Sequence, residues 1–201
     1  MSRERLGVFG GTFDPPHIGH LILAAEANEK LHFDRMLWVL TPVPPHKLEH
    51  PITPLEHRLN MLERALSDDS DFELSRIEMD RPGPHYTVDT MRLLADRYPS
   101  AELILLIGGD SLRDLPTWHR PADLVAACHE IGVIHRPGDA VDLSAWEGQV
   151  PDTQAKVRFV DAPLLDISSR DIRRRIRENL PFRYYLSPHV YEYILKNQLY
   201  R

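Results

Sequence analysis

The sequence predicts an α/β protein with a Rossmann-like, doubly wound parallel sheet, helices on both faces and a small C-terminal helical part. Short apolar runs alternate along the chain with segments whose apolar residues have helical spacing. Glycine pairs follow two of the runs, at Gly10-Gly11 and Gly108-Gly109. Strands that are apolar on both faces are typical of parallel sheets covered by helices on each side.

The first elements surround a glycine turn. A strand over 6–9 ends at Gly10-Gly11, and apolar residues at helical spacing then predict a helix over 18–31. A second strand, 36–40, is stopped by Thr41-Pro42. Prolines recur too often in 42–54 for a regular element, so we expect an ordered surface loop there.

The middle and end of the chain continue the alternation. Leu55, Leu59, Leu62 and Leu66 share one face of a predicted helix, and the most apolar strand, 103–107, precedes the second glycine pair. Residues 137–155 are polar and are expected to be the least structured. The other predicted elements are strands over 72–75, 131–134 and 157–160 and helices over 87–97, 122–128, 168–179 and 187–197.

Length and composition indicate one folded domain. The 201 residues are 42% hydrophobic and 27% charged, which is ordinary globular usage and disfavours disorder or a fibrous repeat. We therefore expect a single domain over 1–201, in which residues from about 165 to 201 form a C-terminal helical subregion. Assembly into a homo-oligomer is left open.

Charge and cysteine content restrict the class of function. Lys and Arg total 24 against 30 Asp and Glu, a net charge of −6 that argues against a protein that coats nucleic acid. The single Cys128 can form neither an intramolecular disulfide nor a cysteine-based zinc site. No early segment has a signal-peptide pattern, and the longest strongly apolar run is far shorter than the ~20 residues that cross a bilayer. We expect a cytoplasmic protein without a membrane span.

The segment from Gly10 to His20 reads G-G-T-F-D-P-P-H-I-G-H and follows the first strand. Ligands of open parallel sheets bind beyond the carboxyl ends of the strands, where the topology reverses. The glycines allow close backbone approach, and the amide N–H groups at the start of the following helix favour an anion. His17 and His20 lie three residues apart, so both can donate hydrogen bonds to phosphate from one helical turn. No third ligand or Glu base accompanies them, so we expect no metal site.

This segment resembles the G-G-x-F-D-P-x-H-x-G-H signature of the nucleotidyltransferase superfamily. Over nearly its full length the chain is similar to the bacterial nicotinate-nucleotide adenylyltransferase family. The resemblance implies the nucleotidyltransferase fold and an enzyme of NAD biosynthesis that joins ATP to nicotinate mononucleotide, giving nicotinate adenine dinucleotide and pyrophosphate. Mg²⁺ is expected to arrive with the ATP phosphates.

Three later motifs extend the resemblance toward the pyridine nucleotide. Pro44-Pro45-His46-Lys47 matches a P-H-K segment that closes over the phosphates, which places Lys47 on a phosphate and gives His46 a weaker claim. His85-Tyr86-Thr87 matches an S-Y-T segment in which threonine helps to hold the nicotinate carboxylate; Thr87 could otherwise be a helix cap. Trp118 matches a tryptophan that stacks on the pyridine ring.

Two further motifs point to the adenine nucleotide. The Asp110 carboxylate after Gly108-Gly109 can accept hydrogen bonds from ribose hydroxyls, or it could cap a short helix. The segment from Ile167 to Arg173 resembles an I-S-S-T-x-I-R signature at a helix start, with Arg170 in place of Thr. Residues 168–183 hold six Arg against two acids, a local charge of +4 that leaves −10 for the rest. Of these arginines we expect Arg173 and then Arg170 to face the triphosphate.

The predicted site therefore has three parts. The expected catalytic residues are His17, His20, Lys47 and Arg173. The expected ATP contacts are Gly10, Gly11, Thr12, Phe13, His17, His20, Gly108, Asp110, Ile167, Ser168, Ser169, Arg170 and Arg173. The expected nicotinate mononucleotide contacts are Lys47, Thr87, Asp110, Trp118 and Arg136.

Three alternatives remain open at this point. A pantetheine-phosphate adenylyltransferase shares the first signature, but that group typically has Thr at the position of His17. A nicotinamide-mononucleotide adenylyltransferase would act on a ring that differs in one group. A non-catalytic nucleotide sensor could use the same fold, although binding alone would not require so many His, Lys and Arg at the phosphate positions.

Overall fold

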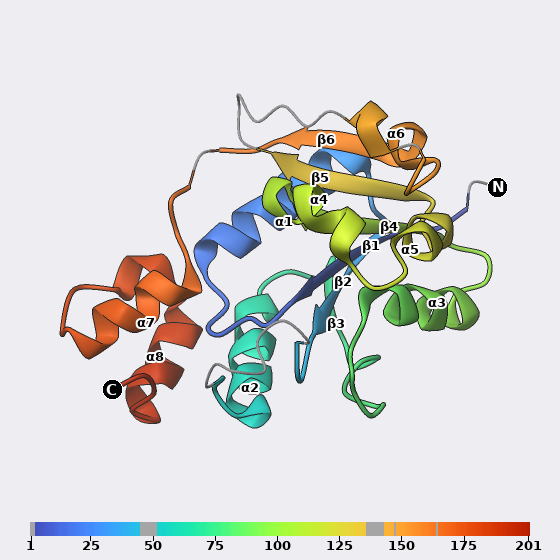
Figure 1. The fold of residues 1–201 in the computed structure, drawn as a ribbon. Coiled ribbons are helices and arrows are strands. Elements are labelled where there is room, and N and C mark those ends of the chain that lie inside the picture. The colour runs from blue at the N-terminus through green and yellow to red at the C-terminus, as the bar shows by residue number, and fades with distance from the viewer. Residues whose placement is uncertain (1–2, 45–51, 136–142, 147, 164) are drawn as a thin grey trace.

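A computed structural model describes residues 3–44, 52–135, 143–146, 148–163 and 165–201 (Figure 1). Six strands form one parallel sheet of order β3-β2-β1-β4-β5-β6. The strands are β1 (Arg5–Gly11), β2 (Arg35–Leu40), β3 (Phe72–Ser75), β4 (Glu102–Gly108), β5 (Glu130–His135) and β6 (Val157–Asp161). The predicted parallel sheet is confirmed, and each predicted strand and helix ends within two residues of its expected bounds.

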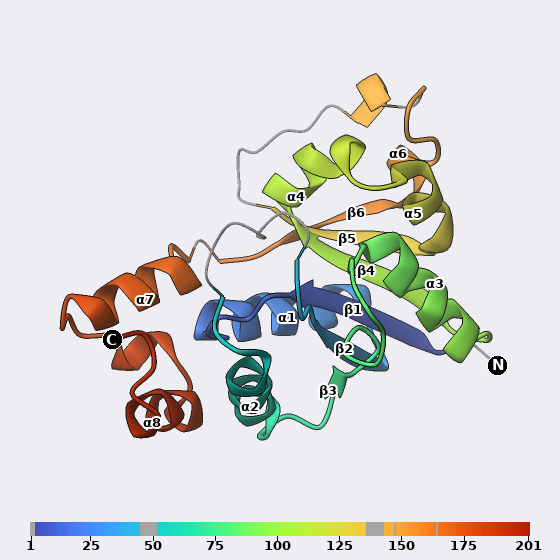
Figure 2. The ribbon, with the colours of Figure 1, turned by 60° about the horizontal axis from the view of Figure 1, so that its bottom comes forward.

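Helices cover both faces of the sheet (Figures 1 and 2). On one face α1 (Ile18–Leu31) and α2 (Leu55–Leu66) bury apolar side chains against Trp38 and Ile104. On the other face α3 (Thr87–Arg97), α4 (Gly109–Asp114) and α5 (Pro121–Ala127) pack against Val8 and Leu105. The fold is therefore doubly wound, as predicted. In the described residues no helix is both long and apolar enough to cross a membrane.

The strand order locates the point where the topology reverses. The chain runs outward from β1 through β2 to β3, returns to β4 on the other side of β1, and then continues outward to β6. The carboxyl ends of β1 and β4 are therefore neighbours at the switch point, where open α/β sheets bind their ligands. β1 ends in Gly10-Gly11, and β4 ends at Gly108, the first residue of the second glycine pair.

The last helices pack beside α2 (Figure 1). They are α7 (Ser169–Arg177) and α8 (Pro188–Lys196), joined through a short 3-10 helix, η4 (Arg183–Tyr185). Their buried residues Ile172 and Ile194 form an apolar cluster with Met61 of α2. This cluster fixes the C-terminal segment against α2. Residues 45–51 of the predicted loop over 42–54, which precedes α2, lie outside the described residues.

The described residues contain four further short helices, whose bounds were not predicted from the sequence. After β4 come α4 and the 3-10 helix η2 (Leu115–Thr117); within the segment expected to be least structured lie η3 (Leu143–Trp146) and α6 (Thr153–Lys156). The expectation for 137–155 is therefore wrong at these two places. Such helices are too short to show a period, and burial of side chains such as Leu112 and Leu115 stabilises them instead.

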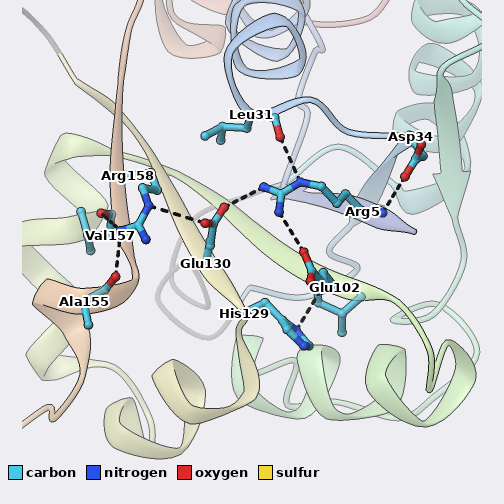
Figure 3. A network of polar contacts seen from close by, with 10 residues as sticks. Arg5, Leu31, Asp34, Glu102, His129, Glu130, Ala155, Val157 and Arg158 are labelled. Carbon is cyan, nitrogen blue, oxygen red and sulfur yellow. Dashed lines mark hydrogen bonds and ion pairs between the residues drawn. The ribbon is translucent and has the colours of Figure 1, made fainter. Parts of the chain in front are cut away.

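A network of charges ties the amino ends of four elements together (Figure 3). The Arg5 guanidinium donates to Glu102 at 2.8 Å, to Glu130 at 2.7 Å and to the Leu31 carbonyl at 3.2 Å. Arg158 of β6 lies 3.5 Å from the second Glu130 oxygen. These contacts lie at the end of the sheet opposite the switch point, so we expect them to act on stability alone.

Replacing Arg5 by methionine is expected to lower the free energy of unfolding by about 1–2 kcal/mol, because Glu102 and Glu130 lose their shared cation. The matched control is Arg35→Met, whose partners Glu4 and Glu73 are more exposed and whose loss should cost under about 1 kcal/mol. Urea denaturation measures both. Equal losses in the two variants would contradict the role assigned to Arg5.

Candidate active site

Two clefts open at the carboxyl edge of the sheet. The larger, of about 780 Å³, lies between the ends of β1 and β4 and the start of α3. The smaller, of about 350 Å³, lies between β4, α4 and the segment 162–167. Phe9 and Gly108 line both. The clefts are therefore neighbours that share a wall at the switch point.

Gly10 and Gly108 face open space at this edge. A Cβ atom built on either would meet no other atom within 4 Å, and both residues line a cleft. Internal packing therefore does not require glycine at these two strand ends. Glycine there leaves the backbone accessible to a bound molecule, which is the role the sequence suggested.

His17 and His20 cap α1 reciprocally. The Nδ1 atom of His17 accepts the N–H of His20 at 3.3 Å, and the Nδ1 atom of His20 accepts the N–H of His17 at 3.2 Å. The two rings stack with centroids 3.7 Å apart. The His20 ring also lies 5.2 Å from Phe13 and 6.2 Å from Phe9, so the histidine pair stands next to the wall between the clefts.

The capping bonds determine where the imidazole protons lie. A ring nitrogen that accepts an N–H cannot carry a proton, so each neutral ring is protonated at Nε2. Burial lowers the pKa of His17 from 6.5 to about 4, because the charged form would lose its hydration. His17 is therefore a neutral Nε2–H donor at pH 7.

The lowered pKa of His17 makes folding sensitive to acid. The unfolded chain binds this proton more tightly than the folded chain, so stability is lost as pH falls from about 6.5 toward 4. Between pH 7 and pH 5 we expect a loss of about 2 kcal/mol from this group. The test is denaturant titration of wild type and of His17→Asn, which keeps a capping oxygen, at both pH values. The free energy of unfolding should fall between pH 7 and pH 5 by about 2 kcal/mol less in the variant than in wild type. An unchanged pH dependence would contradict the assignment.

The larger cleft contains two predicted contacts of nicotinate mononucleotide, Thr87 and Trp118, together with Gly10, Gly11 and Thr12. Tyr86 is the N-cap residue of α3, and no side chain caps its first turn. Thr87 is therefore not the cap, and the helix start remains available to an anion. Tyr86 stacks on His119 with ring centroids 4.0 Å apart, and both line the same cleft as Trp118.

His85, at the Ser position of the S-Y-T match, lines the larger cleft and also bonds to the backbone of the protein. Its ring is buried, and its Nε2 atom lies 2.9 Å from the backbone oxygen of Glu78. A carbonyl can only accept, so Nε2 carries a proton in this contact as well. Through this hydrogen bond the buried His85 ring stabilises the turn before α3.

The smaller cleft contains Asp110 and Ile167 from the predicted ATP contacts. The interpretation of Asp110 as a helix cap is wrong: Gly108 is the N-cap residue of α4, and Asp110 lies in the first turn. Its carboxylate is largely exposed and pairs with Arg113 one turn later. The apolar side of this cleft is formed by residues such as Leu23, Ile134 and Leu165.

The start of α7 contacts the Gly10–His20 segment. Ser168 caps α7 by accepting the N–H of Asp171 at 3.1 Å, whereas Ser169 donates to the Pro15 carbonyl at 2.8 Å. The Arg173 guanidinium donates to the Asp14 carbonyl at 2.5 Å. Arg170 is exposed. Of the predicted residues, Lys47 and Arg136, with His46, lie outside the described part of the chain.

Arg58, a buried arginine that links three segments of the site, was not predicted from the sequence. It is 2% exposed and donates to the carbonyls of Thr12, Thr41, Pro42 and Thr53 at 2.7–3.1 Å. Burial lowers its pKa. The sequence does contain one indication that Arg58 is buried: it shares the helix face of Leu55 and Leu62, where a charged residue is unexpected.

A switch-point cleft pair, accessible strand-end glycines and a helix start with two imidazole donors define a nucleotide-binding α/β protein of the nucleotidyltransferase class. Residues 8–175 match the model of the family described as Cytidylyltransferase-like. A protein of Thermomicrobium roseum described as "Probable nicotinate-nucleotide adenylyltransferase" is 48% identical over 198 residues, which are 98% of this chain and 92% of the relative. A Roseiflexus sp. protein with the same description is 41% identical over the whole of both chains.

Solved structures agree with this likeness. The Plasmodium falciparum nicotinic acid mononucleotide adenylyltransferase complexed with NaAD superposes with a TM-score of 0.80 over 98% of this chain and 97% of its own, at 20% identity. At that identity the match supports the fold. The chain belongs to the nicotinate-nucleotide adenylyltransferase family.

Proposed function

We propose that this protein transfers the adenylyl group of ATP to nicotinate mononucleotide, forming nicotinate adenine dinucleotide and pyrophosphate. The observation that carries the proposal is the pair of clefts that meet at the Phe9–Gly108 wall beside the histidine pair of α1. Two nucleotides bound in neighbouring clefts would bring their phosphates together at this wall. Family membership supports the same reaction.

The chemistry requires positioning more than proton transfer. A phosphate oxygen of nicotinate mononucleotide attacks the α-phosphorus of ATP, the bond from that phosphorus to the bridging oxygen breaks, and pyrophosphate leaves with the bonding electrons. The nucleophile is already an anion at pH 7, so the reaction needs no general base. Catalysis then depends on alignment of two anions and on neutralisation of charge at the α-phosphate and the leaving group.

The larger cleft suits the pyridine nucleotide. Trp118 offers a flat aromatic face to the ring, and the uncapped start of α3 at Thr87 offers a positive dipole end. A helix start favours the carboxylate of nicotinate over the neutral amide of nicotinamide. We assign Arg136 and Lys47 to the same nucleotide on the family resemblance.

The smaller cleft suits the adenosine part of ATP. Its apolar residues can hold a purine, and the exposed Asp110 carboxylate can accept ribose hydroxyls. We assign the triphosphate to the start of α1, to Arg173 and to Ser168, Ser169 and Arg170 at the start of α7. Among the residues with described positions, no group of three or more His, Cys, Asp or Glu could hold a metal ion. Magnesium is expected to enter as part of the substrate MgATP.

Pyrophosphate release by the purified protein tests the proposal. ATP and Mg²⁺ are supplied with nicotinate mononucleotide, nicotinamide mononucleotide or phosphopantetheine in parallel. We expect turnover with nicotinate mononucleotide and much slower turnover with the other two. Preference for the amide or for phosphopantetheine would name a different transferase, and absence of turnover with all three would favour a nucleotide sensor.

A further inference from the structure

Asp14 is a buried carboxylate in the segment that leads into the histidine pair. It is 6% exposed and lies three residues before His17. Its Oδ1 atom accepts the hydroxyl of Tyr200 at 2.7 Å, and its Oδ2 atom accepts the N–H of Thr53 at 3.3 Å. Its carbonyl accepts Nη1 of Arg173, and the same nitrogen lies 3.9 Å from Oδ2.

Two residues with positive φ angles, Gln198 and Tyr200 itself, bring the Tyr200 side chain to Asp14. Beyond α8 the backbone adopts left-handed conformations at Gln198 (φ 52°) and Tyr200 (φ 67°), which L residues rarely adopt unless surrounding contacts hold them. The hydroxyl of Tyr200 also lies 3.8 Å from the sulfur of Met61 in the C-terminal cluster. Burial, and then the neighbouring Asp14 carboxylate, raise the pKa of this phenol, so the hydroxyl stays protonated and donates.

The hydrogen bond between Tyr200 and Asp14 affects which anions the Arg173 guanidinium can bind. Arg173 is the arginine that we assign to the triphosphate, and it already binds the Asp14 carbonyl. The Asp14 carboxylate is a competing anion next to the same guanidinium. With Oδ1 engaged by Tyr200 and Oδ2 by Thr53, the carboxylate stays beyond hydrogen-bond distance of Arg173.

We propose that Asp14 and Tyr200 are positioning residues for adenylyl transfer. The Tyr200 hydroxyl holds the Asp14 carboxylate off Arg173, which leaves the guanidinium for ATP, and anchors the loop that presents His17 and His20. The C-terminal end of the chain thus sets the geometry of the phosphate site. This inference rests on the proposed function.

The test compares Tyr200→Phe with Tyr193→Phe. Tyr193 is a matched control, since its hydroxyl also joins the C-terminal helices to α2, through a 2.9 Å hydrogen bond to His57 Nδ1 that involves no residue of the segment from Thr12 to His20. In Tyr200→Phe we expect kcat to fall about 10-fold and the KM for ATP to rise several-fold, with the KM for nicotinate mononucleotide within twofold. Tyr193→Phe should leave all three within twofold. Unchanged ATP parameters in Tyr200→Phe, or equal changes in the control, would overturn the proposal.

A second substitution separates positioning from loss of packing. Asp14→Asn removes the charge that competes for Arg173, so adding it to Tyr200→Phe should bring the KM for ATP back toward the Asp14→Asn value. A further rise in the KM for ATP in the double variant would overturn the inference that Asp14 competes with ATP for Arg173.

Hydrogen exchange of the amides from Thr12 to His20 gives a readout that does not need turnover. We expect faster exchange in Tyr200→Phe and wild-type exchange in Tyr193→Phe. If wild type turns over none of the nucleotides, the proposed function fails while this measurement still tests the anchor. Wild-type exchange in Tyr200→Phe would overturn the anchor.

Discussion

His20→Ala is expected to lower kcat about 100-fold, the scale of losing one preorganised hydrogen-bond donor to the transition state. His20 lies beside the wall that the two clefts share, and its Nδ1 atom is occupied by the N–H of His17. The Nε2–H group is therefore fixed in direction before substrate binds. A fixed, neutral donor can stabilise charge on the α-phosphate without reorganisation.

Two further variants separate this role from helix capping. His20→Asn keeps an acceptor near the position of Nδ1 but has no group at the position of Nε2, so we expect wild-type thermal stability with the same loss of kcat. His20→Gln can place an amide N–H near Nε2 and should recover part of the rate. Steady-state kinetics and thermal melting measure these effects. A kcat within fivefold of wild type in His20→Asn would remove the donor from the mechanism.

The sheet and most of the helices could be predicted from sequence because their signals are local. The apolar runs at 36–40 and 103–107 and the periodic helix over 55–66 are visible within windows of a few residues. The parallel, doubly wound sheet followed from the alternation of strands and helices, whereas the order of its strands was not predicted. A short helix after Gly108-Gly109 was considered, but the bounds of α4 could not be predicted, because burial of Leu112 stabilises this helix and burial depends on the whole fold.

The site could be predicted only where its residues form a continuous motif. The segment from Gly10 to His20 indicated the helix start and both histidines, and the structure adds that each ring caps the other's amide. Tyr200 bonds to a residue 186 positions earlier, and Arg58 bonds to Thr12 across 46 positions. No local pattern encodes such pairs. Contact of Lys47 and Arg136 with the pyridine nucleotide remains a prediction from the resemblance.

Arg58→Met is expected to lower the free energy of unfolding by about 3–5 kcal/mol. The guanidinium donates to four carbonyls, which lie just beyond β1, just beyond β2 and before α2. Methionine fills similar space but donates nothing, so these buried acceptors lose their partner, each at a cost of about 1–3 kcal/mol before water relieves some of it. Against a typical stability of about 5–15 kcal/mol, this is a large fraction.

Arg64→Met is the matched control for Arg58, because Arg64 lies on the same helix, is exposed and contacts the Tyr193 ring at 4.9 Å. Its loss should cost about 1 kcal/mol or less. Arg58→Lys retains the charge but cannot reach four carbonyls from one ammonium, so an intermediate loss is expected and provides a readout if the methionine variant does not fold. Urea denaturation at pH 7 measures all three. If both Arg58 variants lose no more free energy of unfolding than Arg64→Met, the segments beyond the carboxyl ends of β1 and β2 do not depend on this arginine for their stability.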